Sequence, residues 1–338
     1  MVLYSPRKRP PLSAYGIAIP VAPDRSARVF EALCSHADLG PLAAAWHIHR
    51  DGAMLDREDL LRVHDRGYVE RLFSDRAEEE IVRAFELLDE NGAYRRYDPS
   101  RAVRPLAELA RVSLENASAV TQCCRESLER GFCFFLGGGH HHAHYDFGHG
   151  FCVLNDTVIA LRKLQAEGAV RNAWVIDVDA HKGDGTAALT QNDASIITLS
   201  VHMARGWPLD GERTDERGNV KPAFLPSDID VPVEQREEAL YNGKLEAALK
   251  ELAGRPPADI AVVVSGSDPY EKDTLPSASD LRLTAAQMLD RDLLIWNFLS
   301  GRQIPRAYLM AGGYGPDSWE VYPPFLEHVL VRHFGLET

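Results

Sequence analysis

The sequence of 338 residues has few cysteines, no long hydrophobic run and no excess of basic residues. Its five cysteines are an odd number, and two of them are the neighbours Cys123 and Cys124, so we expect reduced thiols and no disulfide framework. No hydrophobic run approaches the roughly 20 residues of a membrane-spanning helix. Residues 1–16 contain no hydrophobic core followed by a small-residue cleavage site. We therefore expect a cytoplasmic protein.

The formal net charge of −13 predicts that the protein does not bind nucleic acid directly. The short basic cluster Arg7, Lys8 and Arg9 is too small to change this expectation. An acidic surface instead tolerates or attracts cationic partners, although most of these carboxylates serve solubility. The sequence predicts no membrane association and leaves the oligomeric state open.

No repeat, low-complexity segment or long linker divides the chain, and we expect a single domain over residues 1–338. Short hydrophobic runs, typical of strands buried on both faces of a parallel sheet, occupy residues 133–136, 173–179, 196–202, 260–268 and 307–314. Helical patterns occupy residues 156–168, 234–254 and 285–301, and the last two end in a glycine that suits a C-cap. Their alternation predicts an α/β fold, an open parallel sheet flanked by helices.

Polar side chains gather where four of the predicted strands end. In an open parallel sheet, ligands bind in the crevice beyond the carboxyl ends of the strands, so we expect the active site there. The residues concerned are His140, His141, His142, Asp177, Asp179, His181, Asp268 and Tyr314.

One of these strand ends has the pattern of a metal site. Asp177, Asp179 and His181 alternate along an extended segment, so they should face the same side. Buried carboxylates are costly unless they are paired or bind a cation, which favours a metal. A zinc site with three protein ligands needs one more group, and Asp268 supplies it. Asp184, nearby, is alternatively explained as a helix N-cap or turn residue.

Together, these segments resemble the histone deacetylase family of the arginase-deacetylase superfamily. The resemblance covers nearly the whole chain and rests on "VLYSPR", "GGGHHHAHYDFGHGFCVLND", "VIDVDAHKGDG", "SGSDPYEKD" and "LMAGGYG". The segments "DAHKGDG" and "LTAAQMLDRDLLIW" look closest to the class IV branch. The resemblance implies a bacterial-type, single-domain lysine deacylase, a zinc-dependent amidohydrolase that removes acetyl or longer acyl groups from lysine side chains of a protein or peptide.

The resemblance also implies individual roles. The residues are the zinc ligands Asp179, His181 and Asp268; the histidine pair His141 and His142 with the acidic partners Asp177 and Asp184; the transition-state residue Tyr314; and the substrate-contacting residues Gly150, Phe151 and Trp207. It further implies Zn²⁺ as the cofactor, Fe²⁺ as an alternative in the cell, and a structural K⁺ near Asp177. The sequence departs from the commoner family pattern at His140, Lys182, Pro269 and Tyr270, which affects the expected tunnel shape and rim.

The four histidines of "HHHAH" then have a chemical explanation. Two carboxylate ligands already neutralise a divalent zinc ion, so its bound water is less acidic than with three neutral histidines and a nearby base is needed. We assign His142 as general base and then general acid, and His141 as mainly electrostatic. Tyr314 is expected to donate a hydrogen bond to the oxyanion. Loop packing or solvent exposure is the expected role of His140, His144 and His149.

Three alternatives remain open. A binuclear, arginase-like hydrolase would need bridging carboxylates, but Gly183, Gly266 and Tyr270 near the ligands are not acids. A non-catalytic acyl-ligand binding module would be expected to lose the histidine pair or the tyrosine. An acetylpolyamine amidohydrolase would share the chemistry, although the sequence identifies no acidic gate at the rim.

The acyl chain length depends on two further features. The class IV resemblance implies a pocket for long acyl groups and improved efficiency on at least one longer acyl-lysine. The triple glycine 137–139 either leaves room for such a chain or serves only a tight turn.

Overall fold

A computed structural model describes residues 1–6 and 10–336, so the basic cluster Arg7, Lys8 and Arg9 lies outside the described residues. The described chain forms one parallel eight-stranded sheet in the order β2-β1-β3-β8-β7-β4-β5-β6. The strands are β1 Val2–Leu3, β2 His47–Ile48, β3 Phe132–Phe135, β4 Ala173–Asp177, β5 Ile196–Met203, β6 Ile229–Val233, β7 Ile260–Val264 and β8 Arg306–Leu309. The predicted open parallel sheet is confirmed.

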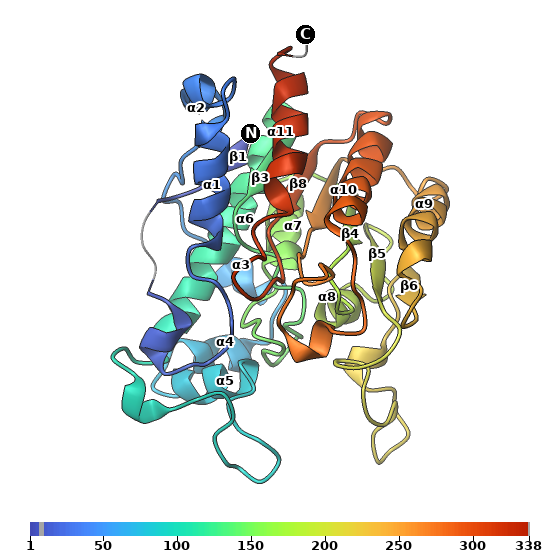
Figure 1. Cartoon of the computed structure of the whole chain (residues 1–338). Helices are drawn as coiled ribbons and strands as arrows, with labels where there is room; N and C mark the ends of the chain where they lie inside the picture. Colours follow the sequence, from blue (N-terminus) through green and yellow to red (C-terminus); the bar gives the residue numbers. More distant parts are fainter. Residues whose placement is uncertain (7–9, 337–338) are drawn as a thin grey trace.

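Helices cover both faces of the sheet (Figure 1). The α-helices are α1 Arg25–Ser35, α2 Ala43–Trp46, α3 Arg57–Leu61, α4 Arg66–Leu72, α5 Ala77–Ala84, α6 Glu108–Arg130, α7 Asp156–Ala166, α8 Asp184–Leu189, α9 Tyr241–Leu252, α10 Ala285–Ser300 and α11 Tyr322–His333. Helix α6 packs on β3 and β8 and also contacts α7. Helix α9 packs on β6. It contacts α10, which contacts α11, and α11 in turn contacts α1.

All the predicted strands and helices exist, but several have different ends. The predicted strands 173–179, 260–268 and 307–314 end at Asp177, Val264 and Leu309, because the residues that follow leave the sheet to form the site. The predicted helix 234–254 begins only at Tyr241, since the carboxylate of Glu237 accepts a hydrogen bond from the Glu234 backbone and forms a turn there.

Of the two expected glycine C-caps, the one at Gly254 is wrong and the one at Gly301 is confirmed. Helix α9 is capped by Ala253, and Gly254 follows it. Gly301 does cap α10, but with φ −62° it lies in the right-handed region, so no left-handed cap forms.

Two hydrophobic clusters form the core. The larger surrounds the sheet, where every residue of β4 and β7 is buried, and each buried valine or isoleucine contributes roughly 1.5–3 kcal/mol. The smaller lies among α3, α4, α5, α6 and α7. Tyr314 packs against both clusters, so the junction between them falls at the carboxyl edge of the sheet.

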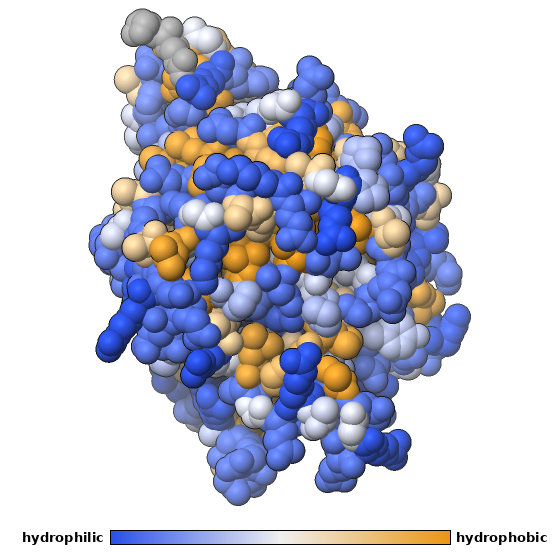
Figure 2. All heavy atoms as spheres, turned by 90° about the vertical axis from the view of Figure 1, so that its right-hand side faces the viewer, coloured by the Kyte–Doolittle hydropathy of each residue, from blue (hydrophilic) through white to orange (hydrophobic). Residues whose placement is uncertain are grey.

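The surface shows both hydrophilic and hydrophobic areas. On the face shown in Figure 2, hydrophobic residues form separate patches between hydrophilic ones. In the described part of the chain, no helix combines the length and hydrophobicity needed to cross a bilayer. All five cysteines are free thiols, and four of them are buried.

Candidate active site

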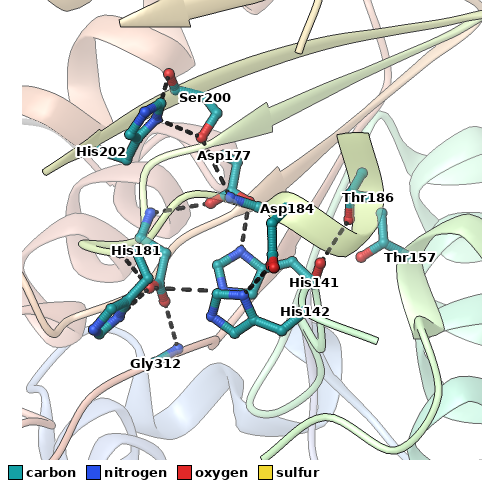
Figure 3. A network of polar contacts seen from close by, with 12 residues as sticks. His141, His142, Thr157, Asp177, His181, Asp184, Thr186, Ser200, His202 and Gly312 are labelled. Atoms are coloured by element: carbon teal, nitrogen blue, oxygen red, sulfur yellow. Dashed lines mark hydrogen bonds and ion pairs between the residues drawn. The ribbon is translucent and has the colours of Figure 1, made fainter. Parts of the chain in front are cut away.

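Four neighbouring strands carry the polar residues singled out from the sequence. They are β3, β8, β7 and β4, which lie side by side in the sheet. Because the strands are parallel, their carboxyl ends meet at one edge, and the segments that follow them converge there (Figure 3). The prediction that these residues meet at this edge is confirmed.

Asp179, His181 and Asp268 form a compact, buried group. The Nδ1 atom of His181 lies 2.9 Å from Asp268 Oδ2 and 3.3 Å from Asp179 Oδ1. One ligand atom from each residue lies within 4.8 Å of the others. Asp177 does not join them, contrary to the expected alternation, because the strand ends at Asp177 and its carboxylate turns toward His141.

The surroundings of this group leave no room for larger side chains. A Cβ atom on Gly266 would lie 2.8 Å from Asp268 Oδ1 and would overlap the carboxylate of Asp179. A Cβ on Gly312 would lie 2.7 Å from Asp268 Oδ2. Burial, aided by the charge of Asp179, raises the pKa of Asp268 to about 6. Two closely held, buried carboxylates and one imidazole fit a divalent cation such as zinc.

The histidine pair lies beside this group, and each imidazole is held by its own carboxylate (Figure 3). His141 Nδ1 lies 2.6 Å from Asp177 Oδ2, and His142 Nδ1 lies 2.6 Å from Asp184 Oδ1. The two ring centroids are 3.9 Å apart. Asp184 is the first residue of α8, and its N-cap is Gly183, so the alternative reading of Asp184 as an N-cap is wrong.

The two imidazoles differ in charge although they are neighbours. Burial alone would lower the pKa of His141, but the charges of Asp177 and Asp179 raise it to about 9. For His142, burial and the charge of His141 lower the pKa to about 3. Near neutral pH, His141 is therefore an imidazolium, and His142 is a neutral imidazole with a free lone pair.

Tyr314 follows β8 and faces the same edge. Its backbone N–H donates to Asp273 Oδ2 at 2.6 Å, which fixes the turn. Burial and the charge of Asp268 raise the pKa of its phenol well above the usual value, so the hydroxyl stays a hydrogen-bond donor. The guanidinium of Arg25 donates to the carbonyl groups of Met310 and Gly313, at 3.0 and 2.7 Å, and supports this turn from behind.

The three expected substrate-contacting residues surround the histidines and the tyrosine. Trp207 lies with its ring centroid 4.6 Å from that of His142, and Phe151 lies 6.2 Å from Tyr314. A Cβ on Gly150 would overlap Trp207 and lie 2.6 Å from His142 Cδ2. Phe151 has φ 66°, a conformation that costs on the order of 1–3 kcal/mol and is typical of functional sites.

The triple glycine is explained by the turn. Gly138 and Gly139 have φ 77° and 78°, which favour glycine. A Cβ atom on either would lie 2.6 Å from a side-chain atom, Cγ2 of Val120 or Cβ of Ala311 respectively. Glycine is therefore required at both positions by the backbone conformation and by these close contacts, and the acyl chain length stays a prediction of the class IV resemblance.

Three of the residues that depart from the family pattern pair with acidic side chains. His140 Nδ1 pairs with Asp156 at 2.8 Å, in keeping with the expected loop packing. Lys182 is buried and its Nζ lies 3.1 Å from Asp230. Tyr270, after Pro269, is buried and donates to Glu320.

His144 and His149 depart from their expected roles. His144 is buried with Nε2 3.0 Å from Asp184 Oδ2, and His149 Nδ1 lies 3.4 Å from the same oxygen. Helix α8 packs its first turn on the backbone of residues 141–143, because the Thr186 N–H donates to the His141 carbonyl at 2.9 Å. The loop that follows is therefore brought back to Asp184. The only sequence signal was the number of histidines.

Sequence reasoning also missed Arg291. Its guanidinium is fully buried, pairs with Asp292, and donates to the carbonyl groups of Val178 and Gly266 at 3.1 and 2.8 Å. Val178 precedes Asp179, and Gly266 lies two residues before Asp268. One side chain thus ties together the two loops that carry the buried carboxylates.

Arg291→Lys is expected to weaken zinc binding by about 10–100-fold, because a single ammonium cannot bridge both carbonyl groups and Asp292. Competition with a chromogenic chelator measures the affinity, and thermal unfolding of the metal-free protein separates it from a loss of stability. Arg302→Lys, at an exposed position two residues beyond the end of the same helix, is the matched control. Unchanged affinity in Arg291→Lys would show that the guanidinium does not position these loops.

The comparison with known proteins agrees with this architecture. The family described as "Histone deacetylase domain" matches residues 19–322. An uncharacterized protein of Picosynechococcus sp. is 30% identical over 207 residues, covering 61% of this chain and 64% of that protein. The acetoin utilization protein AcuC of Bacillus subtilis is 26% identical over 60% of this chain. The chain spans about half of that AcuC and 64% of the Picosynechococcus protein.

The solved structures show the same fold. A crystal structure of a histone deacetylase homolog in complex with SAHA superposes with a TM-score of 0.68 at 18% identity, over 99% of this chain and 83% of that one. With the family match over most of its length, the chain belongs to the histone deacetylase family.

Proposed function

We propose that this protein is a zinc-dependent amidohydrolase that removes acetyl or longer acyl groups from lysine side chains in proteins or peptides. The observation that carries the proposal is the buried imidazole of His142, whose Nδ1 lies 2.6 Å from Asp184 Oδ1 and whose ring centroid lies 6.0 Å from that of His181. Among the relatives, one from Arabidopsis thaliana is named histone deacetylase 2, with 24% identity over 60% of this chain, which supports a deacetylase.

The metal and the protein would divide the chemistry. Zinc held by Asp179, His181 and Asp268 would supply a Lewis acid that polarises the amide carbonyl and the attacking water. We also propose Fe²⁺ as an alternative in the cell. A structural K⁺ near Asp177 remains a proposal, supported by Ser200, which pairs with Asp177 in the register of β4 and β5.

The side chains of the chain itself move the protons. His142 accepts a proton from the attacking water at Nε2, while its Nδ1–H donates to Asp184. The same proton passes to the lysine nitrogen as the C–N bond breaks, giving acetate and the free amine. His141 stays an imidazolium and stabilises negative charge. Tyr314 donates its O–H to the carbonyl oxygen as that oxygen becomes an oxyanion.

A second candidate is hydrolysis of acetylated polyamines. An acidic hollow of about 500 Å³, lined by Glu86, Asp89 and Glu90 together with Leu88 and Arg95, supports this candidate. Phe85, the residue before Glu86, packs with its ring centroid 6.2 Å from that of Phe151. Against this candidate, the guanidinium of Arg96 lies 5.8 Å from the Phe151 ring and repels a polycation.

Metal analysis tests the proposed chemistry. The purified protein is expected to hold about one tightly bound zinc ion per chain, and a chelator should abolish hydrolysis of an acetyl-lysine peptide until zinc is restored. Two tightly bound ions that share Asp179 or Asp268 would instead indicate a binuclear hydrolase. Full activity in the metal-free protein would contradict the proposal.

A substrate panel tests the acyl group and its carrier. We expect activity on acetyl-lysine peptides and a higher kcat/KM for at least one of the octanoyl and myristoyl peptides, since each buried methylene contributes roughly 0.8 kcal/mol. Acetylated polyamines should be poorer substrates because of Arg96. A steep fall of kcat/KM with chain length would contradict the long-chain expectation of the class IV resemblance, and a polyamine that outperforms every peptide would favour the second candidate.

A further inference from the structure

The carboxylate of Asp184 has a second oxygen that the proposed mechanism does not use. Its Oδ1 atom holds His142, whereas its Oδ2 atom faces two other imidazoles. His144 Nε2 lies 3.0 Å away and His149 Nδ1 lies 3.4 Å away. Asp184 and His144 are buried, and the side chain of His149 is 25% exposed.

These three atoms have the arrangement of metal ligands. They lie within 4.8 Å of one another. His149 Nδ1 is buried, and no hydrogen bond of normal geometry joins it to Asp184 Oδ2, 3.4 Å away. In a tetrahedral zinc site with bonds of about 2.0–2.2 Å, neighbouring ligand atoms lie roughly 3.3 Å apart.

The surroundings supply the support that a metal-binding histidine needs. Glu86 Oε1 is buried without a hydrogen-bond partner and lies 3.7 Å from His149 Nε2, on the far side of that ring. A carboxylate in this place orients an imidazole whose other nitrogen binds a metal. The ring of His144 is stacked on Phe147 with centroids 4.6 Å apart, which fixes its direction.

A cation also has a route to this group. Glu86, whose carboxylate lies beside His149, also lines the surface hollow that contains Asp89 and Glu90. Acidic groups around an entrance raise the local concentration of cations. A water molecule would complete the four ligands of a tetrahedral site.

We propose that His144 Nε2, His149 Nδ1 and Asp184 Oδ2 form a second, weaker site for zinc or a similar transition metal, and that a metal there inhibits hydrolysis. Two imidazoles and one carboxylate favour such metals over Mg²⁺ or Ca²⁺. The inhibition rests on the proposed function: a cation on Asp184 Oδ2 draws negative charge away from Oδ1, which orients His142. This site shares no ligand with the group of Asp179, His181 and Asp268.

Titration with Zn²⁺ and with Co²⁺ tests the site, starting from protein that carries one equivalent of zinc. Equilibrium dialysis should show a second equivalent in the wild type, and cobalt should give the visible absorption of a tetrahedral complex. His149→Gln and His144→Gln should each keep the first equivalent and lose the second. Glu86→Gln should weaken the second by about 10–100-fold. His140→Gln, in the same segment but paired with Asp156, should bind both.

The inhibition is measured as the ratio of rates with one equivalent and with excess zinc. It should reach at least tenfold in the wild type and in His140→Gln and vanish in His149→Gln. Binding of only one equivalent by the wild type, or of a second by His149→Gln, would overturn the site. A second equivalent without inhibition would overturn the coupling to His142. Absence of hydrolysis at one equivalent would refute the proposed function, while the dialysis result would still decide the second site.

Discussion

Replacing His142 with alanine is expected to lower kcat by about 10²–10⁴-fold, the usual contribution of a general acid–base residue. The reason lies in the difference between the two buried imidazoles. His141 is protonated near neutral pH because Asp177 and Asp179 raise its pKa to about 9, so it cannot accept a proton. His142, with its pKa lowered to about 3 by burial and by His141, is the neutral member of the pair.

Steady-state rates on an acetyl-lysine peptide measure this effect, with the zinc content determined for every variant. His140→Ala is the matched control, because it is the preceding histidine and pairs with Asp156 outside the site. The fall in kcat should be at least tenfold smaller in His140→Ala than in His142→Ala. A near-normal rate in His142→Ala with zinc bound would mean that another group serves as the base.

Tyr314→Phe is expected to lower kcat by about 10²–10³-fold while leaving KM and zinc binding little changed. The variant removes one hydroxyl and keeps the ring that packs between the two hydrophobic clusters. Burial and the charge of Asp268 keep the phenol protonated, so the wild-type residue is a donor throughout the neutral pH range. Its hydrogen bond strengthens only as charge develops on the carbonyl oxygen, so the loss falls on kcat.

Tyr322→Phe provides the control for this substitution. Tyr322 is also fully buried, and its hydroxyl donates to the carbonyl of Ser265 at 3.1 Å, away from the expected substrate. Its loss should lower stability by about 1 kcal/mol and leave kcat nearly intact. If both tyrosine variants kept normal rates, Tyr314 would not stabilise the transition state.

The sequence by itself determined the sheet, the edge at which the site lies and the residues that meet there. Continuous hydrophobic runs such as 260–264 predict buried parallel strands because both faces of such a strand are covered. Polar residues at the ends of these runs must then meet at one edge, whatever the details of the loops. Asp179, His181 and Asp268 could be predicted as ligands for this reason, together with the motifs of the family.

Only the tertiary structure decided what each polar group faces. Asp177 turns away from Asp179 and His181 because the strand ends there, and no periodicity predicts that turn. His144 and His149 reach Asp184 because α8 packs back on residues 141–143, a contact across about 40 residues of sequence. Arg291 joins two loops from a helix more than 20 residues further along the chain. Such contacts depend on how separate elements pack, and local sequence patterns carry no information about that packing.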